Sequence, residues 1–285
     1  MRKLSTRTAI LLCALGIALP MTARAQNQQQ PQPNNQQGQQ QKPAPGTQQQ
    51  NPPAEAPKVD PQEEADYKAI TALKPDAYDD TIKLGEAFVQ KYPSSRYDES
   101  VYARLTQAYY SKQDIPKMNV AGEKALALNP DDVSVLVPLG YVTPHFADPN
   151  DMDYERKLQK AEQELKHALE LIPTTPKPAN VSDDDFAKLK AGAAEEAHSG
   201  LGLVYFRQGK FDQSVEELKQ VTTGPDVDAT NLYVMGVDYQ QLKRYNEAAD
   251  AYGKCAAMSG QLQPRCKQRA DQMKIQAGSQ PAAKP

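Results

Sequence analysis

Apolar residues between positions 60 and 276 recur at the three- and four-residue spacing of a helix, with polar residues between them. Leu165, Ala168 and Ile172 show this spacing, and the segment Tyr245–Met258 repeats it. Proline is scarce inside these segments and common between them, and no segment sustains the alternation typical of a strand. The pattern therefore predicts an all-α fold.

Two stretches of this region have the same spacing of small and large residues, 34 positions apart. GLVYFRQGKFDQSVEELKQV begins at Gly202, and GVDYQQLKRYNEAADAYGKC begins at Gly236. Glycine inside a helix costs about 1 kcal/mol relative to alanine, so a glycine kept twice at one position indicates close approach of a second helix. The residues that define the spacing are Gly202, Tyr205, Gly209 and Phe211 in the first stretch and Gly236, Tyr239, Tyr245 and Ala248 in the second.

This spacing resembles the tetratricopeptide repeat, a helix pair whose helices cross where their residues are small. The resemblance implies an α-solenoid of stacked antiparallel helix pairs, a superhelix. The fold class that we expect adds a disordered N-terminal tail, which the composition predicts. It is strong for the two units between about residues 195 and 260 and looser for the three units before them. The stretch YPSSRYDESVYARL, which begins at Tyr92, is also similar to the repeat variety found in bacterial envelope proteins.

Turns and helix-start signals divide the repeat region into units. Asp60 and Pro61 supply an N-cap and a proline in the first helical turn. Pro264 begins a polar helix that fits the terminal cap such an array needs. The predicted units are 62–95, 99–132, 133–173, 182–226 and 229–260, inside a repeat domain at 60–276 that ends in a cap helix at 264–276 and precedes a disordered tail at 277–285.

The first residues predict export. A basic start, the short apolar run Ala9–Pro20 and an A-x-A site ending at Ala25 are typical of a secretory signal peptide over residues 1–25. The apolar run is shorter than the roughly 20 residues that a bilayer requires. A lipid anchor on Cys13 is the alternative, which the Leu12 before it disfavours. The style of this signal indicates a bacterial protein of the periplasm or the cell exterior.

Residues 26–58 are predicted to be a disordered linker rich in glutamine and proline. The stretch Gln26–Gln50 contains 13 glutamines in 25 residues. Because it has almost no apolar surface to bury, ordering it would cost backbone entropy with little return. We expect a tether, and self-association through the glutamine run is the alternative.

The charge of the chain argues against a nucleic-acid partner. The complete sequence has a formal net charge of −3, and residues 1–25 contain four cations and no acid, so their removal leaves −7. Contact with phosphates requires clustered lysine and arginine. The chain has no such cluster, and we therefore expect no nucleic acid among its partners.

No set of residues suited to catalysis or metal binding stands out. His145, His167 and His198 are far apart in sequence, whereas a metal site needs close pairs or a cysteine and histidine cluster. The acidic loop Asp148–Glu155 lacks the glycine and the spaced glutamate of an EF-hand loop. We expect no enzyme activity, no metal and no cofactor.

Cys255 and Cys266 are the only cysteines left once the predicted signal peptide is removed. Export to an oxidising compartment favours a disulfide, and antiparallel helices would bring the two residues together. The alternative is two small core residues, since Cys255 takes a position where alanine is usual in the repeat. Both interpretations stay open at this point.

The resemblance also indicates where a partner would bind, because the first helix of each pair lines the concave side of such an array. Aromatic and polar side chains there suit a peptide, although several could instead pack against neighbouring units. The Lys, Asn and Arg set with which relatives bind a free C-terminal carboxylate is missing. The predicted binding residues are Tyr110, Tyr141, Phe206, Arg207, Tyr233, Gln240 and Gln241.

These features predict a non-catalytic scaffold or adaptor of the bacterial cell envelope, which binds a protein or peptide on the concave face of its repeats. The mature chain has no predicted transmembrane segment. Two other classes stay open. One is an accessory subunit of an envelope enzyme or carbohydrate-handling complex, and the other is a structural repeat protein that assembles into homo-oligomers.

Overall fold

The described part of the chain is helical throughout. The structure is a computed structural model that describes residues 60–179, 181–223 and 227–279, and these residues contain no strand. The predicted signal peptide at 1–25 and linker at 26–58 lie outside the described residues. The predicted all-α fold is confirmed for the repeat region.

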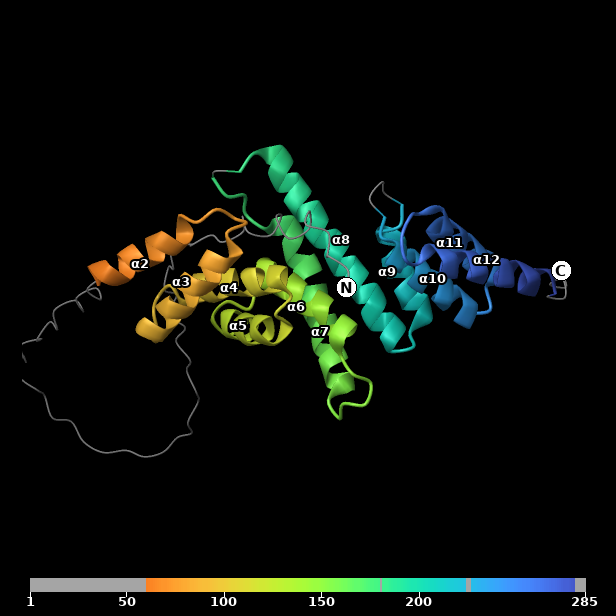
Figure 1. The fold of residues 1–285 in the computed structure, drawn as a ribbon, viewed down its shortest axis with the longest axis horizontal. Helices are drawn as coiled ribbons and strands as arrows, with labels where there is room; N and C mark the ends of the chain where they lie inside the picture. The colour runs from red at the N-terminus through yellow and green to blue at the C-terminus, as the bar shows by residue number, and fades with distance from the viewer. Residues whose placement is uncertain (1–59, 180, 224–226, 280–285) are drawn as a thin grey trace, which may run out of the picture.

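The helices follow one another along the long axis of the molecule, from α2 at one end to α12 at the other (Figure 1). α8 is the longest of them, with 25 residues. In chain order they are α2 (Pro61–Thr71), α3 (Tyr78–Lys91), α4 (Asp98–Lys112), α5 (Ile115–Leu128), α6 (Val133–Phe146), α7 (Tyr154–Leu171), the 3-10 turn η2 (Ile172–Thr174), α8 (Asp183–Arg207), α9 (Phe211–Gln220), α10 (Ala229–Gln241), α11 (Tyr245–Ala257) and α12 (Gln263–Gly278).

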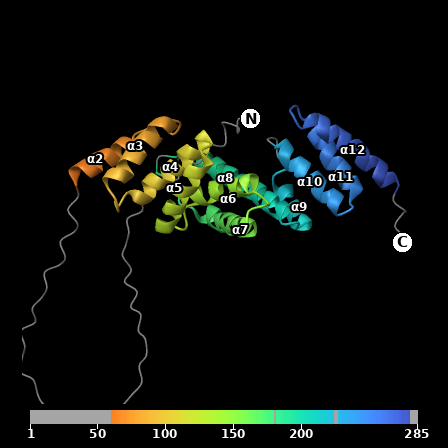
Figure 2. The same cartoon turned by 60° about the horizontal axis from the view of Figure 1, so that its bottom comes forward.

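These helices form antiparallel pairs that stack on one another (Figure 2). The pairs are α2 with α3, α4 with α5, α6 with α7, α8 with α9, and α10 with α11, and α12 closes the array. Side-chain caps define several helix starts, as where Asp60 accepts from the backbone N–H of Gln62 and Asp228 from that of Thr230. The architecture is the α-solenoid that the sequence predicts.

The first helices of successive pairs contact one another, and the second helices do so far less. Contacts join α4 to α6, α6 to α8 and α8 to α10, whereas within the described residues no second helix packs comparably on the next second helix. A stack whose first helices lie closest together curves with those helices on the inside. We call α4, α6, α8 and α10 the inner row, and α3, α5, α7, α9 and α11 the outer row.

Three hydrophobic clusters follow one another along the array. The first contains residues of α2, α3, α4, α5 and α6. The second contains residues of α6, α7 and α8, and the third contains residues of α9, α10, α11 and α12. Each unit therefore buries its apolar face against its neighbours rather than in one central core, as solenoids do.

The two glycines that are 34 residues apart lie where the helices of a pair touch. A Cβ atom on Gly202 would lie 2.5 Å from Leu218 Cδ2. A Cβ atom on Gly236 would lie 2.7 Å from Tyr252 Cδ1. The short distance between these helices also allows the buried Ser214 on α9 to contact α8, because its Oγ lies 2.8 Å from the Gly202 carbonyl oxygen. The missing side chains therefore set the distance at which these helices cross.

The other repeat-defining residues lie around these crossings. Tyr205, Tyr239 and Ala248 are buried. Phe211 and Tyr245 are half-buried and begin α9 and α11. They surround the glycine contacts with large side chains, which is the packing that their spacing indicates.

The turn inside three of the pairs uses a left-handed residue at the same place. Gly209, Gln113 and Lys243 have φ values of +72°, +61° and +58°. Glycine adopts this conformation freely, whereas it costs the other two roughly 1–2 kcal/mol each. The residue after each one donates its backbone N–H to the carbonyl oxygen of a buried tyrosine five positions earlier, namely Tyr205, Tyr109 and Tyr239.

A backbone hydrogen bond that a proline removes from α6 is replaced by one from a side chain of the preceding unit. Pro138 has no N–H to donate to the carbonyl oxygen of Ser134, four residues earlier. The side-chain amide of Gln107 on α4 donates a hydrogen bond to that oxygen. Because Gln107 and Ser134 are buried, the carbonyl that the proline leaves free ties the second unit to the third.

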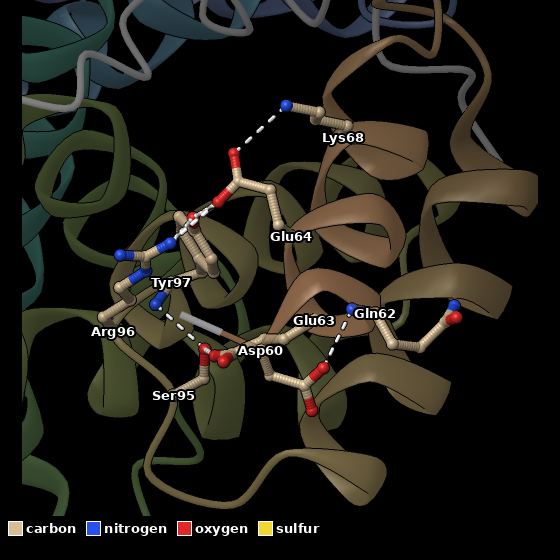
Figure 3. Close-up of polar contacts among 8 residues, drawn as sticks. All are labelled: Asp60, Gln62, Glu63, Glu64, Lys68, Ser95, Arg96 and Tyr97. Atoms are coloured by element: carbon tan, nitrogen blue, oxygen red, sulfur yellow. Dashed lines mark hydrogen bonds and ion pairs between the residues drawn. The ribbon is translucent and has the colours of Figure 1, made fainter. Parts of the chain in front are cut away.

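Polar and aromatic side chains dock α2 against the turn between α3 and α4 (Figure 3). Glu64 on α2 lies 2.7 Å from Arg96 Nη2 and 3.3 Å from Lys68 Nζ. It also accepts a hydrogen bond from the Tyr97 hydroxyl, which is the main reason that its pKa is lowered. The Tyr97 ring stacks on Tyr67 with centroids 3.9 Å apart. Since exposed ion pairs contribute little, the stacked rings carry more of this attachment.

The closing helix α12 is covalently joined to α11. The sulfur atoms of Cys255 and Cys266 are bonded, the Cα atoms are 5.8 Å apart, and both residues are buried. α12 continues to Gly278, which corrects the predicted start of the disordered tail at 277. Ala277 is a strong helix former and carries the helix past the predicted end. The remaining tail residues 280–285 lie outside the described residues.

The glycine crossings can be tested with one matched pair of substitutions. Gly236→Val is expected to lower the free energy of unfolding by about 2 kcal/mol, because its side chain would press on the buried Tyr252 ring. Gly253→Ala, where an added Cβ meets no atom within 4 Å, should raise it by about 1 kcal/mol. Urea unfolding followed by circular dichroism measures both. Equal destabilisation of the two variants would contradict the close crossing.

The disulfide can be tested by mass and by stability. Unreduced protein should have two hydrogen atoms fewer than reduced protein, and two free thiols would rule the bond out. Replacing Cys255 and Cys266 together by alanine should lower the free energy of unfolding by about 3 kcal/mol, since the bond closes a loop with a sequence separation of 11. Alanine suits both buried positions, so the loss reports on the cross-link. The measurement is urea unfolding of both proteins under non-reducing conditions.

Candidate protein-interaction surface

The seven residues predicted to bind a partner all lie on the inner row, but the structure exposes them unequally. Tyr110 is buried, Gln241 is exposed, and the other five are half-buried. They come from each inner-row helix: Tyr110 from α4, Tyr141 from α6, Phe206 and Arg207 from α8, and Tyr233, Gln240 and Gln241 from α10.

Tyr110 joins two units instead of facing a partner. Its hydroxyl donates a hydrogen bond to Glu196 Oε1 at 2.5 Å, which connects α4 to α8. Glu196 Oε2 is buried and has no hydrogen-bond partner in the described part of the chain. Burial raises the pKa of Glu196 to about 7, and the neighbouring Glu195 adds to the shift. The inner row brings α8 over the end of α4. This contact buries Tyr110, which the repeat pattern predicts to face outward.

Tyr141 and His145 lie one turn apart on α6, close to charged side chains from α8 and α10. Their ring centroids are 4.7 Å apart. His145 is exposed, yet the surrounding protein atoms and then the Arg207 charge lower its pKa, while Asp228 acts in the opposite direction. His145 is therefore exposed to solvent and also within the electrostatic influence of side chains from the next two units. We call Tyr141, His145, Arg207 and Asp228 the middle cluster.

A second group forms where the inner row meets the closing helix. Tyr233 of α10 has its ring centroid 5.6 Å from that of the buried Tyr252. Arg265 of α12 lies over the Tyr233 ring, 5.1 Å from its centroid. The Tyr252 hydroxyl donates to Gln240 Oε1 at 3.4 Å. We call Tyr233, Gln240, Tyr252 and Arg265, together with Arg269 one turn further along α12, the C-terminal cluster.

Phe206 and Gln241 belong to neither cluster. Phe206 packs against the third hydrophobic cluster, the one formed by α9, α10, α11 and α12. Its ring centroid lies 6.4 Å from that of Phe211. Gln241 is exposed at the end of α10. Phe206 therefore contributes mainly to packing between units, whereas Gln241 is open to a partner.

A buried carboxyl group links three helices behind this surface. Asp238 Oδ2 lies 2.6 Å from Ser214 Oγ, which in turn lies 2.8 Å from the Gly202 carbonyl oxygen. The serine hydroxyl has one hydrogen, so both contacts are hydrogen bonds only when Asp238 is protonated and donates to Ser214. Burial raises the pKa of Asp238 to about 7, in agreement with this arrangement.

Sequence reasoning missed Glu196, Asp238, Arg265 and Arg269. Asp238 comes three residues after the buried Met235, a spacing that signals a position facing the protein interior. Arg265 and Arg269 are four residues apart on a helix that was recognised only as polar. Nothing in the sequence indicates that this helix reaches Tyr233.

Two of the three histidines lie within hydrogen-bonding distance of a carboxylate. His167 Nε2 lies 2.7 Å from Asp131, and His198 Nδ1 lies 2.7 Å from Glu217. Among the residues that the structure describes, no group of three or more His, Cys, Asp or Glu is placed to hold a metal ion. None of the described helices combines the length and the apolar character that a membrane span requires.

Comparisons with known proteins name no family for this chain. No protein-family model matches the sequence, and no curated protein matches it. Among solved structures, the chain is similar to a thermophilic tetratricopeptide-repeat protein of Thermus thermophilus at 18% identity, with a TM-score of 0.43 over 75% of this chain and 99% of that one. At this TM-score the match carries no argument, and the class of the protein rests on its stacked helix pairs and glycine crossings.

The protonated state of Asp238 makes stability depend on pH. A carboxyl group with a pKa of about 7 in the folded protein and an ordinary value of 3.8 stabilises fully below about pH 4 and loses this effect as pH rises through 7. We expect it to lower the free energy of unfolding by on the order of 2–3 kcal/mol between about pH 5 and pH 8. Urea unfolding across this range measures the change.

Two variants separate Asp238 from the other titrating groups. Asp238→Asn keeps a hydrogen-bond donor for Ser214 and does not titrate, so it should remove this part of the pH dependence. Asp250→Asn changes an exposed aspartate on α11 and should leave the profile as in the wild type. An unchanged slope in Asp238→Asn would show that Asp238 is ionised in the folded protein.

Proposed function

We propose that this protein is a non-catalytic scaffold or adaptor of the bacterial cell envelope, which binds a protein or peptide partner on its inner row. Stacked helix pairs offer one extended face to which several units contribute. Selection of the partner then depends on the side chains of that face.

The middle cluster is the observation that carries this proposal. The rings of Tyr141 and His145 on α6 lie 4.7 Å apart, and the charges of Arg207 on α8 and Asp228 at the start of α10 act on His145, so three successive units contribute. An accessible aromatic ring beside both donors and acceptors suits the side chains and backbone of a peptide.

The envelope location rests on the predicted signal peptide over residues 1–25 and is supported by the bonded pair Cys255 and Cys266, since disulfides persist in oxidising compartments. The predicted linker at 26–58 would hold the repeat domain at a distance from whatever its N-terminal end contacts.

Capture from envelope extract tests the inner row directly. The double variant Tyr141→Ala with Arg207→Gln should reduce the amount of specifically captured protein by at least about tenfold, because it removes an aromatic anchor and a charged donor. The matched control is Val120→Ser with Leu128→Ser, two exposed apolar residues of α5 in the outer row, which should capture as the wild type does. Quantitative mass spectrometry reads out all three proteins, and circular dichroism confirms their helicity.

Two results would contradict the proposal. An inner-row variant that retains the full set of captured proteins would exclude the middle cluster as the binding surface. No specific capture, together with an oligomer that grows with concentration in light scattering, would favour a self-assembling repeat protein instead.

A further inference from the structure

Arg265 and Arg269 are cations without an anionic partner in the described part of the chain. They are one turn apart on α12, so both side chains lie on the same side of that helix. Arg265 is exposed and Arg269 half-buried, and within the described residues neither forms an ion pair or a hydrogen bond. By contrast, Arg96, Arg156 and Arg244 each bind a carboxylate at 2.7–3.0 Å.

The Arg265 guanidinium is positioned although no carboxylate among the described residues binds it. It lies over the Tyr233 ring, 5.1 Å from the centroid, in a cation–π contact that restricts its freedom. The disulfide between Cys255 and Cys266 joins α12 to α11 at the residue next to Arg265. A cation that is already oriented loses little freedom when a ligand binds, and arginine in this state favours planar carboxylates.

Asp238, a buried acid on α10, does not satisfy this pair. Its Oδ2 lies 2.6 Å from Ser214 Oγ, and within the described residues no ion pair joins it to either arginine. The positive charge of the C-terminal cluster is therefore left for a group from outside the described residues.

We propose that Arg265 and Arg269, with the Tyr233 ring beneath Arg265, bind side-chain carboxylates of an acidic segment in the partner protein. This inference rests on the proposed scaffold function and names the chemistry of one part of the partner. It differs from capture of a free C-terminus, because the arginines lie on the closing helix, outside the repeated helix pairs.

Charge along the inner row favours an acidic protein segment over a polyanion such as nucleic acid or an anionic membrane. The chain is acidic overall, with a net charge of −3 before and −7 after loss of residues 1–25. Asp228 lies at the start of α10 in the inner row, where its carboxylate would repel a continuous polyanion. A protein segment with two neighbouring acidic residues offers one carboxylate to each arginine.

A randomised library of peptides of about ten residues tests this inference with the purified protein. Wild-type protein should select peptides enriched about threefold or more in Asp and Glu at two neighbouring positions. Arg265→Gln with Arg269→Gln should lose this enrichment and bind a selected acidic peptide at least about tenfold more weakly by fluorescence anisotropy. Lys267→Gln with Lys254→Gln removes the same charge from other exposed positions and should change the affinity less than about twofold.

The outcomes separate this inference from the proposed function. Selection of peptides without acidic enrichment, or equal selection by the arginine variant, overturns the acidic-segment inference and leaves peptide binding intact. Selection of no peptide at all counts against both. Binding to vesicles that contain anionic lipid, lost in the arginine variant and without acidic selection, would assign the arginines to a membrane surface and overturn the inference.

Discussion

The inner row depends on helices that cross where a side chain is missing. Leu165 shows how far this constraint reaches, because a Cβ on Gly140 would lie 2.5 Å from its Cγ and a Cβ on Gly200 would lie 2.9 Å from its Cδ1. Gly140 belongs to the same pair as Leu165, and Gly200 belongs to the next unit. One buried leucine thus fills the space left by two glycines and fixes both the shape of a pair and its distance from its neighbour. Tight packing of this kind transmits a local change in volume to adjacent units.

Close packing of the inner row also explains why polar groups are buried between units. Glu196, Asp238 and Gln107 each have one partner on another helix and one oxygen with none in the described region. A partly satisfied buried polar group costs stability relative to an apolar one, but it favours one arrangement of its neighbours. These contacts therefore specify how units are oriented, while packing of leucine, glycine and tyrosine supplies most of the free energy that holds the units together.

Sequence reasoning succeeded where the determining interaction is local. Helical periodicity and turn residues are properties of short segments, so the all-α fold could be predicted, and Gly202 and Gly236 pointed to close helix contact. It failed where a contact depends on how helices far apart in sequence are placed. Tyr110 contacts Glu196 across 86 residues, and Arg265 contacts Tyr233 only when α12 is docked. It also missed two turns, because Gln113 and Lys243 adopt the left-handed conformation and only a glycine at these positions would have indicated it. The repeat pattern placed the seven predicted binding residues on the inner row, but it gave no indication of Arg265 and Arg269.

The two ends of the array are attached by different forces. α12 is fixed by a covalent bond and several buried residues, whereas α2 has one buried residue, Ile70, and is otherwise held by exposed ion pairs and the stacked rings of Tyr67 and Tyr97. Mechanical tension along the molecule would therefore peel helices from the N-terminal end first, next to the predicted tether. A scaffold built in this way yields on the side of its own attachment, and the C-terminal arginines and the disulfide stay together after the first helices have opened.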